Sequence, residues 1–433
     1  MYAKSAHIYG FKCFGKAVFD LTYPGRDSDA DTLALENVNL ILGDNGGGKS
    51  SVLRAIAIAM LAPALMDAGF VAHRLVRRPD ADDAFLKVWA VLDPDDHVLE
   101  AEGQSELELI ARIDRVNSRR DLDRLHTEST PESPLEKLIY DDRSHAFFVV
   151  GYGATRRVET GDFSPSSARK MRGDRYARVA SLFEDHIALR PLEALLDELG
   201  ERREEALAII NGVLPAGLSL TGDIDKGSGQ AFAIFKDQEM PFSSLSDGYR
   251  AFLGMTGDLV GHLAEVAPSG LALDEVPGIV LIDEVDLHLH PSWQRRVVND
   301  LAATFPKLQF IMTSHSPLIA GSVHSDNILL TEEDPETDTA TIARSDESVY
   351  GQSVDRLLMS AYFGLDATRP EAAVRETDNL VQQAMRGDKD AAIAVLESLS
   401  KPASATKGAG AGRTKAPRAR SKPAAKRRPK TKS

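Results

Sequence analysis

The fold follows from one stretch, Gly43-Asp44-Asn45-Gly46-Gly47-Gly48-Lys49-Ser50. An apolar run, Val38 to Leu42, precedes it, and apolar residues at helical spacing follow it at Val52, Ile56 and Met60. The stretch matches the pattern G-x-x-x-x-G-K-[ST], which joins a strand to a helix in phosphate-binding loops. Backbone N–H groups at the start of such a helix point at phosphate oxygens. We therefore predict a nucleotide-phosphate site between this strand and this helix.

The predicted nucleotide-binding residues are those of the loop and of the first helical turn: Gly43, Asp44, Asn45, Gly46, Gly47, Gly48, Lys49, Ser50 and Ser51. Lys49 is expected to contact the β- and γ-phosphates, and Ser50 is expected to hold Mg²⁺ through its hydroxyl. The alternative is a glycine-rich turn that only connects a strand to a helix. A second stretch, more than two hundred residues later, argues against that alternative.

The second stretch is Ile279-Val280-Leu281-Ile282-Asp283-Glu284. Its apolar residues predict a buried parallel strand that ends in two carboxylates, at the edge where open α/β sheets bind ligands. Because neighbouring strand residues face opposite ways, the two acids can have separate roles. We assign Asp283 to Mg²⁺ and Glu284 to polarising the attacking water. Phosphoryl transfer needs mainly positioning and charge neutralisation, so the two stretches together predict ATP binding and hydrolysis.

The composition is that of an ordinary globular protein, with 43% hydrophobic and 27% charged residues. At 433 residues the chain is expected to form two or three structural parts. The longest apolar run, Ala55 to Met66, contains Pro63 and is shorter than the roughly 20 residues of a membrane-spanning helix. The residues after Met1 show no signal-peptide pattern, and the single cysteine, Cys13, excludes an internal disulfide. These features predict a cytoplasmic protein with no membrane partner.

The last segment, residues 401–433, differs in charge from the rest of the chain. It holds twelve Lys or Arg and no acid, so the other 400 residues carry 39 basic and 65 acidic side chains, a net charge of −26. Its composition predicts a disordered tail. The tail could hold nucleic acid in a salt-sensitive way, or it could fold back on the acidic body, and both alternatives stay open.

Composition divides the chain into five predicted segments: residues 1–64 with the phosphate loop, an inserted lateral region at 65–240, the second part of the ATP-binding unit at 241–335, a helical region at 336–400, and the tail at 401–433. A small antiparallel sheet is expected from Ala6 to Asp20 together with Val38 to Leu42. Residues 191–214 and 350–400 predict helices, and residues 164–178 predict a loop.

Inside the lateral region, residues 146–150 predict another buried strand. The turn after this strand carries Arg156 and Arg157. An arginine there could contact the nucleotide or another ligand through its planar guanidinium. The alternative is that both arginines are simply solvated.

A third motif, Ser243-Ser244-Leu245-Ser246-Asp247-Gly248-Tyr249-Arg250, precedes a helical run, and Ser246 stands where an N-cap is useful. Its position between the phosphate loop and the Asp-Glu strand resembles the LSGGQ-type signature of the ABC ATPase class. The resemblance implies that Ser246 and Gly248 of one subunit contact the γ-phosphate held by the other. Two ATP molecules would then be sandwiched in a head-to-tail homodimer, and a higher assembly stays open as an alternative.

Two further stretches keep the motif order of the ABC class. Residues 285–291 occupy the D-loop position, and residues 310–317 predict a strand that ends in a switch histidine, His315. The resemblance implies that His315 senses the γ-phosphate and orients the water, a role that suits imidazole near neutral pH. Lys49, Glu284 and His315 are therefore the predicted catalytic residues. His288 and His290 lack a third ligand nearby and predict packing or dimer contacts rather than a metal site.

Within the ABC class, residues 277–296 and 313–317 resemble the SMC/RecF-type branch. More narrowly, the chain is similar to standalone bacterial ATP-binding proteins related to the ATPases of Septu-like and retron-linked anti-phage systems and to OLD-family nucleases. The resemblance implies a mixed sheet flanked by helices, an α/β head with an inserted α+β region. It also implies an ATP-gated dimeric switch that controls an effector, such as a nuclease, in phage defence.

Departures from the class narrow the function. Asp247 and Tyr249 replace the glycine and glutamine of the transporter signature, which argues against a transport ATPase. A Q-loop glutamine is not identifiable, and no series of strands and carboxylates suitable for a TOPRIM nuclease follows His315. Two rival functions stay open: a RecF-like DNA-repair ATPase that grips duplex DNA with the tail, and a scaffold locked by ATP with negligible turnover.

Overall fold

The computed structural model describes residues 1–26, 35–78, 80–92, 106–116, 121–128, 139–140, 145–158, 173–225, 230–334, 336–345, 347–365, 367–368 and 371–400. The chain divides into two compact units, Met1–Thr368 and Arg369–Ser433. The predicted tail and residues 164–172 of the predicted loop lie outside the described residues. The expectations for them therefore stay predictions.

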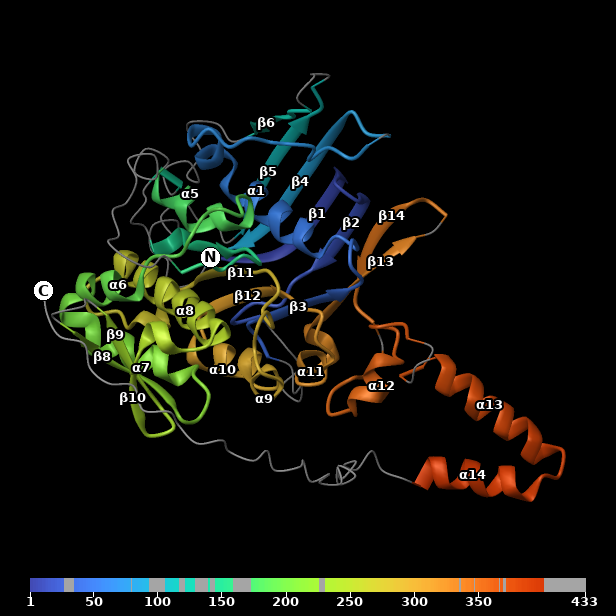
Figure 1. Cartoon of the computed structure of the whole chain (residues 1–433). Coiled ribbons are helices and arrows are strands. Elements are labelled where there is room, and N and C mark those ends of the chain that lie inside the picture. The colour runs from blue at the N-terminus through green and yellow to red at the C-terminus, as the bar shows by residue number, and fades with distance from the viewer. Residues whose placement is uncertain are drawn as a thin grey trace, which may run out of the picture. The chain divides into compact units, whose positions relative to one another are not determined.

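A six-stranded sheet forms the centre of the first unit (Figure 1), with the strand order β14-β13-β3-β12-β11-β7. Strands β7, β11, β12, β3 and β13 pair in parallel, and only β14 runs antiparallel to its neighbour. The bounds are β3 Val38–Gly43, β7 Val149–Tyr152, β11 Gly278–Ile282, β12 Leu308–Thr313, β13 Ile328–Asp334 and β14 Thr339–Ala343. This mixed sheet flanked by helices confirms the predicted α/β fold class.

A second sheet is antiparallel, with the strand order β2-β1-β4-β5-β6. The bounds are β1 Tyr2–Phe11, β2 Phe14–Asp20, β4 Asp83–Val91, β5 Glu106–Asp114 and β6 Arg124–Thr127. The opening segment is antiparallel as expected, but the expectation that Val38 to Leu42 would join it is wrong. All five of those residues are buried, as in a parallel strand covered on both faces, whereas β2 alternates between buried and exposed residues.

Helix α1 (Lys49–Asp67) packs between the two large sheets (Figure 1). The helix continues through Pro63 to Asp67. The helix is long and apolar enough to cross a membrane by length and composition alone, yet 67% of its most apolar window is buried inside the protein. Its apolar surface is therefore that of a core helix.

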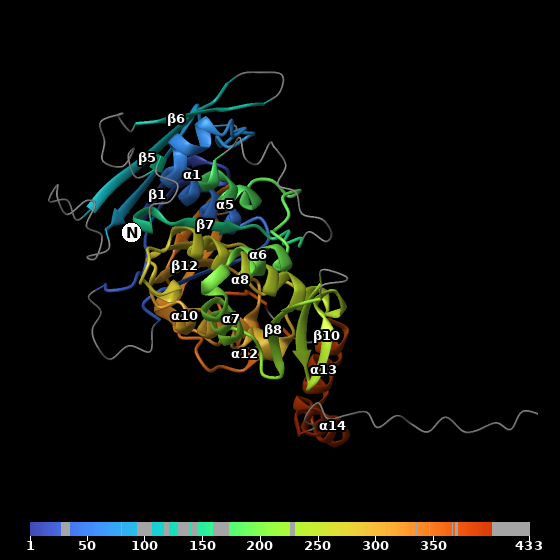
Figure 2. The same ribbon diagram turned by 90° about the vertical axis from the view of Figure 1, so that its left-hand side faces the viewer.

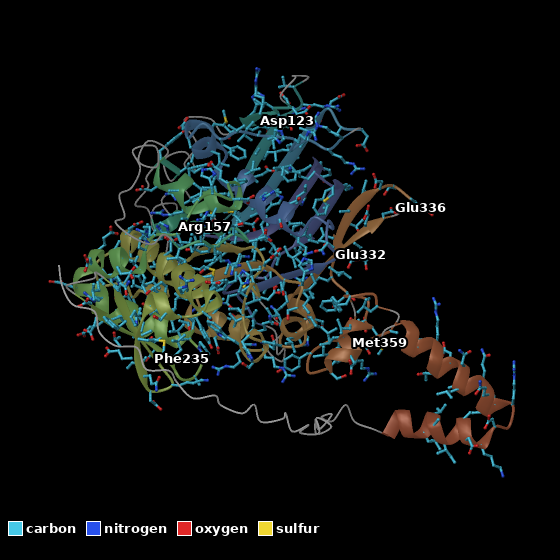
Figure 3. The ribbon with its side chains drawn as sticks, viewed as in Figure 1. Asp123, Arg157, Phe235, Glu332, Glu336 and Met359 are labelled. Atoms are coloured by element: carbon cyan, nitrogen blue, oxygen red, sulfur yellow. The ribbon has the colours of Figure 1, made fainter. Side chains whose placement is uncertain are left out.

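The opposite face of the central sheet is covered by α6, α7, α8 and α10, as Figure 2 shows. The helices of this layer and its surroundings are α5 Asp174–Val179, α6 Leu192–Glu198, α7 Arg203–Gly212, α8 Asp247–Val266, α9 Pro291–Gln294, α10 Val297–Thr304, α11 Pro317–Ala320 and α12 Val354–Leu358. Beside them is a three-stranded antiparallel sheet of β8 Leu218–Ile224, β9 Ala231–Phe235 and β10 Gln238–Pro241. Described side chains fill the space between sheets and helices (Figure 3).

The predicted helices at residues 191–214 and 350–400 are confirmed, the latter by α12 and by the second unit's α13 (Glu371–Met385) and α14 (Lys389–Ser400). The loop expected at residues 164–178 is wrong for residues 174–178, which belong to α5. Residues 65–240 supply β4, β5 and β6 to the antiparallel sheet and β7 to the central sheet. The boundaries of the five predicted segments stay a prediction.

Two buried amide side chains join the central sheet to the N-terminal segment. Gln309 on β12 is fully buried; its Nε2 donates to the carbonyl oxygens of Ala3 at 2.7 Å and Thr22 at 2.8 Å, and its Oε1 accepts from Ala3 N at 2.7 Å. Asn39 on β3 exchanges two bonds of 2.7 Å with the backbone of Thr22. These bonds fix the N-terminal segment against the strand that enters the glycine-rich loop.

Replacing Gln309 by Leu should lower the free energy of unfolding by about 2 to 4 kcal/mol, because it leaves buried backbone groups without partners. Urea denaturation of the whole chain measures this change. Gln382→Leu, at an exposed position of α13, is the control and should shift stability by less than about 0.5 kcal/mol. A Gln309→Leu protein as stable as the control would show that the amide bonds do not hold the segment.

Candidate ATP site

The predicted site residues meet because four parallel strands, β3, β7, β11 and β12, end at one edge of the central sheet. Thr313 pairs with Ile41, and Ile282 pairs with both Met312 and Tyr152. The segments that follow these strands therefore start side by side. They are the glycine-rich loop after β3, the Asp-Glu pair after β11, the turn with the histidine after β12, and the arginine-bearing turn after β7.

The glycine-rich loop has a backbone that only glycine adopts without strain. Gly46 and Gly48 have φ angles of 88° and 92°. A Cβ atom on Gly48 would lie 2.5 Å from the Sγ of Cys13 and 2.7 Å from the ring of Phe14. Helix α1 begins directly after Gly48 and has no side-chain cap, so its first N–H groups face the loop. This is the arrangement of an anion site at a helix N-terminus.

Lys49 is buried, and its Nζ donates to the carbonyl oxygens of Gly43 and Asp44, both at 2.8 Å. Burial lowers the pKa of Lys49, while the carboxylates of Asp283 and Glu284 and that of Asp44 oppose this shift. The ammonium group is therefore within electrostatic range of both acids of the predicted site. Its position agrees with the phosphate-contacting role that we predict for it.

Asp283 and Glu284 are held by Thr313, a residue that sequence reasoning missed. The hydroxyl of Thr313 donates to Oδ1 of Asp283 at 2.6 Å and accepts from the backbone N of Glu284 at 2.7 Å. Glu284 has a φ of 49°, which is rare outside glycine and turns the chain sharply at the end of β11. One sequence signal could have identified Thr313. It is the hydroxyl residue at the end of the apolar strand that lies next to the Asp-Glu strand.

Arg156 is also held against this strand end. It is buried, and its guanidinium donates to the carbonyl oxygen of Asp283 and, at 2.8 Å, to that of Glu284. The sequence left a ligand contact and simple solvation open for Arg156 and Arg157. The structure shows Arg157 exposed and Arg156 bound to the backbone at the end of β11.

His315 follows β12 and is half-buried. Burial, and then the positive charge of Lys49, lower its pKa below the ordinary value of 6.5. The carboxylates of Asp286, Glu284 and Asp283 oppose this shift. The imidazole is therefore mainly neutral at pH 7.

The signature motif begins α8 and packs on the D-loop. Ser246 is the N-cap residue, although its side chain makes no capping bond. A Cβ atom on Gly248 would lie 2.2 Å from the carbonyl oxygen of His288, so only glycine permits this approach. The ring of Tyr249 lies 5.5 Å from both Trp293 and Phe235, the latter labelled in Figure 3. Among the described residues no hydrogen bond joins Ser246 to the glycine-rich loop.

The residues at this edge fit ATP with Mg²⁺. No group of three or more His, Cys, Asp or Glu among the described residues could hold a metal ion. Mg²⁺ fits such a site because it binds through one or two protein ligands together with substrate phosphates. Ser50, at the uncapped start of α1, and Asp283, oriented by Thr313, are the residues that would hold it.

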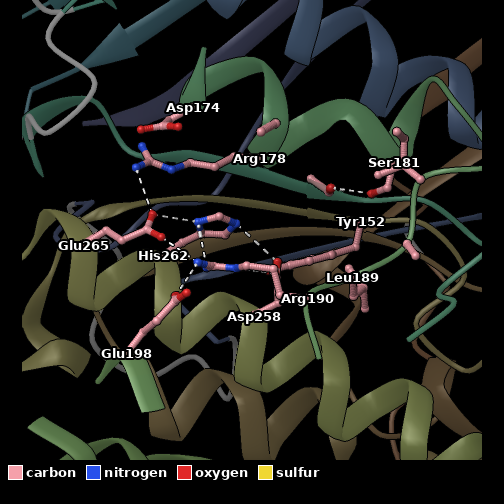
Figure 4. A pocket seen from close by; sticks show the side chains of 14 residues that line it. Tyr152, Asp174, Arg178, Ser181, Leu189, Arg190, Glu198, Asp258, His262 and Glu265 are labelled. Carbon is pink, nitrogen blue, oxygen red and sulfur yellow. Dashed lines mark hydrogen bonds and ion pairs between the residues drawn. The ribbon is translucent and has the colours of Figure 1, made fainter. Parts of the chain in front are cut away.

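A second charged cluster lies behind this edge, between β7 and α8 (Figure 4). The hydroxyl of Tyr152 donates to Asp258 at 3.1 Å, and Nε of Arg190 donates to the same carboxylate at 3.2 Å. Burial alone would raise the pKa of Asp258, but His262 and Arg190 hold it well below its usual range. The cluster joins α8, the helix that begins with the signature motif, to β7, the strand next to β11. Its members are too far apart in sequence to form a recognisable motif.

Residues 67–321 match a family described as "AAA domain, putative AbiEii toxin, Type IV TA system". The chain is 27% identical to the Septu protein PtuA of Bacillus mycoides (strain KBAB4) over 376 residues, which are 86% of this chain and 46% of that protein. It is 43% identical to the Retron Ec83 probable ATPase of Escherichia coli over 86 residues, 20% of this chain and 16% of that protein. The chain thus spans about half or less of the length of these relatives. They confirm the predicted relationship to Septu-like and retron-linked ATPases.

Among solved structures, the chain is similar to the SMC head domain from Thermotoga maritima, with a TM-score of 0.43 and 15% identity over 80% of this chain and 100% of that chain. It is also similar to an SMC head bound to the C-winged helix domain of ScpA, with a TM-score of 0.45 and 16% identity over 80% of this chain and 98% of that chain.

Replacing Thr313 by Val removes the hydroxyl but keeps the shape of the side chain. ATP turnover should fall by about 10- to 100-fold, because Asp283 and the backbone of Glu284 lose the group that orients them. Steady-state phosphate release measures this effect. Thr313→Ser keeps the hydroxyl and should stay within a few-fold of the wild type; equal rates for the two variants would contradict the role of Thr313.

Binding of ATP should take up protons through His315, at a pH between the lowered pKa of the free protein and the higher pKa of the complex. Without nucleotide the pKa is lowered by burial and by Lys49, against Asp283, Glu284 and Asp286. The negative charge of the triphosphate raises it, so between the two pKa values the neutral imidazole becomes protonated on binding.

Calorimetry of ATP binding in buffers of different ionisation enthalpy measures this uptake. His315→Asn should remove this proton uptake. Protons bound or released by ATP itself are the same for the wild type and the variant, so they cancel when the two proteins are compared. His186→Asn is the control, since His186 is 77% exposed. Equal uptake by the wild type and His315→Asn would contradict the prediction.

Proposed function

The chain belongs to the AAA-domain ATPase family that residues 67–321 match, and we propose that it hydrolyses ATP as a dimeric switch that controls an effector protein in anti-phage defence. One observation carries the proposal: Lys49, the Asp283-Glu284 pair and His315 meet where parallel strands end at one sheet edge. Lys49 is within electrostatic range of both carboxylates, and Thr313 fixes the carboxyl of Asp283.

The proposed reaction is attack of water on the γ-phosphorus, with cleavage of the bond between that phosphorus and the β,γ-bridging oxygen. Glu284 orients the water and accepts its proton, and His315 contacts the transferred group. Lys49 leaves the carbonyl oxygens of the loop and neutralises charge on the phosphates. Ser50 and Asp283 would hold Mg²⁺, which when bound would supply further neutralisation of phosphate charge.

The switch is a head-to-tail homodimer in which Ser246 and Gly248 face the ATP of a second copy. Its support is the exposed start of α8, where Ser246 makes no side-chain capping bond and is free to meet a ligand. ATP binding closes the dimer and hydrolysis reopens it. A partner that binds one of the two states better would be held or released accordingly.

The effector role rests on relatives that are a Septu protein and a retron ATPase. A nuclease is the effector that we propose, and the lateral region at residues 65–240 is its docking region. This region supplies strands to both large sheets. A structural change at the sheet edge that holds the proposed ATP site therefore reaches the region through the β7–β11 pairing.

A second candidate function is a DNA-repair clamp, favoured by the twelve cationic residues of segment 401–433. In that case duplex DNA binds with an affinity that falls steeply with salt. Deletion of residues 401–433 would abolish this affinity and any stimulation of turnover by DNA. The effector-controlling switch predicts that both turnover and dimerisation survive the deletion.

Glu284→Gln should reduce ATP turnover by about 100-fold or more, because it removes the group that orients and deprotonates the water. The same substitution should trap an ATP-bound dimer, which the particle mass by light scattering would show. Glu336→Gln, an exposed position labelled in Figure 3, is the matched control and should behave as the wild type. Turnover in Glu284→Gln equal to the control would remove Glu284 from the mechanism.

A further inference from the structure

Gln294 is bonded to two segments that leave the central sheet at the ends of different strands. It is the last residue of α9, the short helix that begins where the D-loop, residues 285–291, ends, and α9 contacts α11 (Figure 1). Its Nε2 donates to the carbonyl oxygens of Leu289 at 3.0 Å and Asp286 at 3.5 Å. Its Oε1 accepts from the hydroxyl of Ser316 at 2.8 Å. One side-chain amide therefore joins the segment after β11 to the segment after β12.

The turn after β12 holds His315 between two buried serines, Ser314 and Ser316. The backbone N of Ser314 donates to the carbonyl oxygen of Ile41 at 3.2 Å. The hydroxyl of Ser314 accepts from the backbone N of Ser316 at 2.9 Å. The position of the backbone that carries the imidazole therefore depends on these two neighbours. Ser314 is bonded to β3, whereas Ser316 is bonded to Gln294.

The hydroxyl of Ser316 depends on Gln294 for its acceptor. At the start of α11 it accepts from the backbone N of Leu318 at 3.2 Å and from that of Ile319 at 3.4 Å. A hydroxyl has a single proton, and Ser316 donates it to Gln294. Ser316 is only 6% exposed, so a lost acceptor is not simply replaced by water. Without the amide, a buried donor would lack a partner unless the turn moved.

The other end of the amide contacts the D-loop, which packs on the start of α8. A Cβ atom on Gly248 would lie 2.2 Å from the carbonyl oxygen of His288, the residue before Leu289. His288 has a φ of 61°, so the chain bends sharply at this contact. Because the two backbones touch, a displacement of the start of α8 would move the carbonyl groups to which Gln294 is bonded.

We propose that Gln294 is a positioning residue for His315, whose place it fixes relative to the D-loop. The inference rests on the proposed function, because it takes His315 to contact the transferred phosphoryl group. An amide suits this role, since it donates to the carbonyl oxygens of the D-loop and accepts from a hydroxyl at the same time. Gln294 acts on the reaction through the turn that carries the imidazole, and a displacement of the D-loop reaches His315 by this route.

The first experiment measures ATP turnover of Gln294→Met, which removes the amide but keeps a side chain of similar length. The kcat should fall about tenfold or more, because a displaced catalytic group reacts poorly. The KM for ATP should change by less than about threefold, since the glycine-rich loop keeps its phosphate contacts. Gln238→Met, at an exposed position on β10, is the matched control and should behave as the wild type.

A double variant separates positioning from a general loss of stability. If Gln294 acts through the imidazole, Gln294→Met combined with His315→Asn should turn over no more slowly than His315→Asn alone. A residue that only stabilises the fold would lower the turnover of His315→Asn by the same factor as that of the wild type. Equal factors in the two proteins would overturn the proposal.

A second measurement needs no turnover. The NMR signal of the His315 ring, assigned by its loss in His315→Asn, is followed while a non-hydrolysable ATP analogue is added. The signal should shift in the wild type and in Gln238→Met, and it should shift less in Gln294→Met at saturating analogue. Equal shifts in Gln294→Met and the wild type would contradict the positioning role.

Ser316→Ala removes the same hydrogen bond from its other partner. It should lower kcat without raising the KM for ATP, and it takes the place of Gln294→Met if circular dichroism shows that variant to be unfolded. If the wild-type protein has no turnover at all, the proposed function fails, while the ring signal of His315 still decides whether Gln294 positions the imidazole.

Discussion

The parallel pairing of β3, β12 and β11 is the constraint on which the rest of the structure depends. It places Ile41, Thr313 and Ile282 in neighbouring positions, so the glycine-rich loop, the histidine turn and the Asp-Glu pair leave the sheet at one edge. Strand residues 38–42, 278–282 and 308–313 are buried on both faces, which only helices above and below the sheet can provide. The site is therefore a consequence of sheet order rather than of any single motif.

The position of the glycine-rich loop also depends on contacts with the antiparallel sheet. Gly48 approaches Cys13 and Phe14 so closely that no side chain fits, which ties the start of α1 to the turn between β1 and β2. The buried amide of Gln309 bonds Ala3 and Thr22 at the open end of the same hairpin, where β1 starts and β2 has ended. The N-terminal segment thus packs against the glycine-rich loop at Gly48, while β3 leads directly into that loop.

Much of the site could be predicted because each of its motifs is a short continuous stretch of sequence. The loop with Lys49, the pair at Asp283 and the histidine at 315 each follow an apolar run that predicts a strand, and their edge of the sheet follows from parallel topology. Thr313 could not be assigned, because its role depends on which strand lies beside β11. The antiparallel placement of residues 38–42 failed for the same reason: strand-forming composition does not distinguish an edge partner from a central strand.

Arg156 connects the end of β11, at the candidate ATP site, to the rest of the chain. Its guanidinium bonds the carbonyl oxygens of Asp283 and Glu284, at the point where Glu284 adopts a left-handed φ of 49°. Its own backbone belongs to a turn that packs on α8 through Val158. The strained backbone of Glu284 costs of order 1 to 3 kcal/mol to maintain, and Arg156 supports it through these bonds. Because the turn that carries Arg156 packs on α8, a displacement of α8 would reach the backbone of Glu284 through this guanidinium.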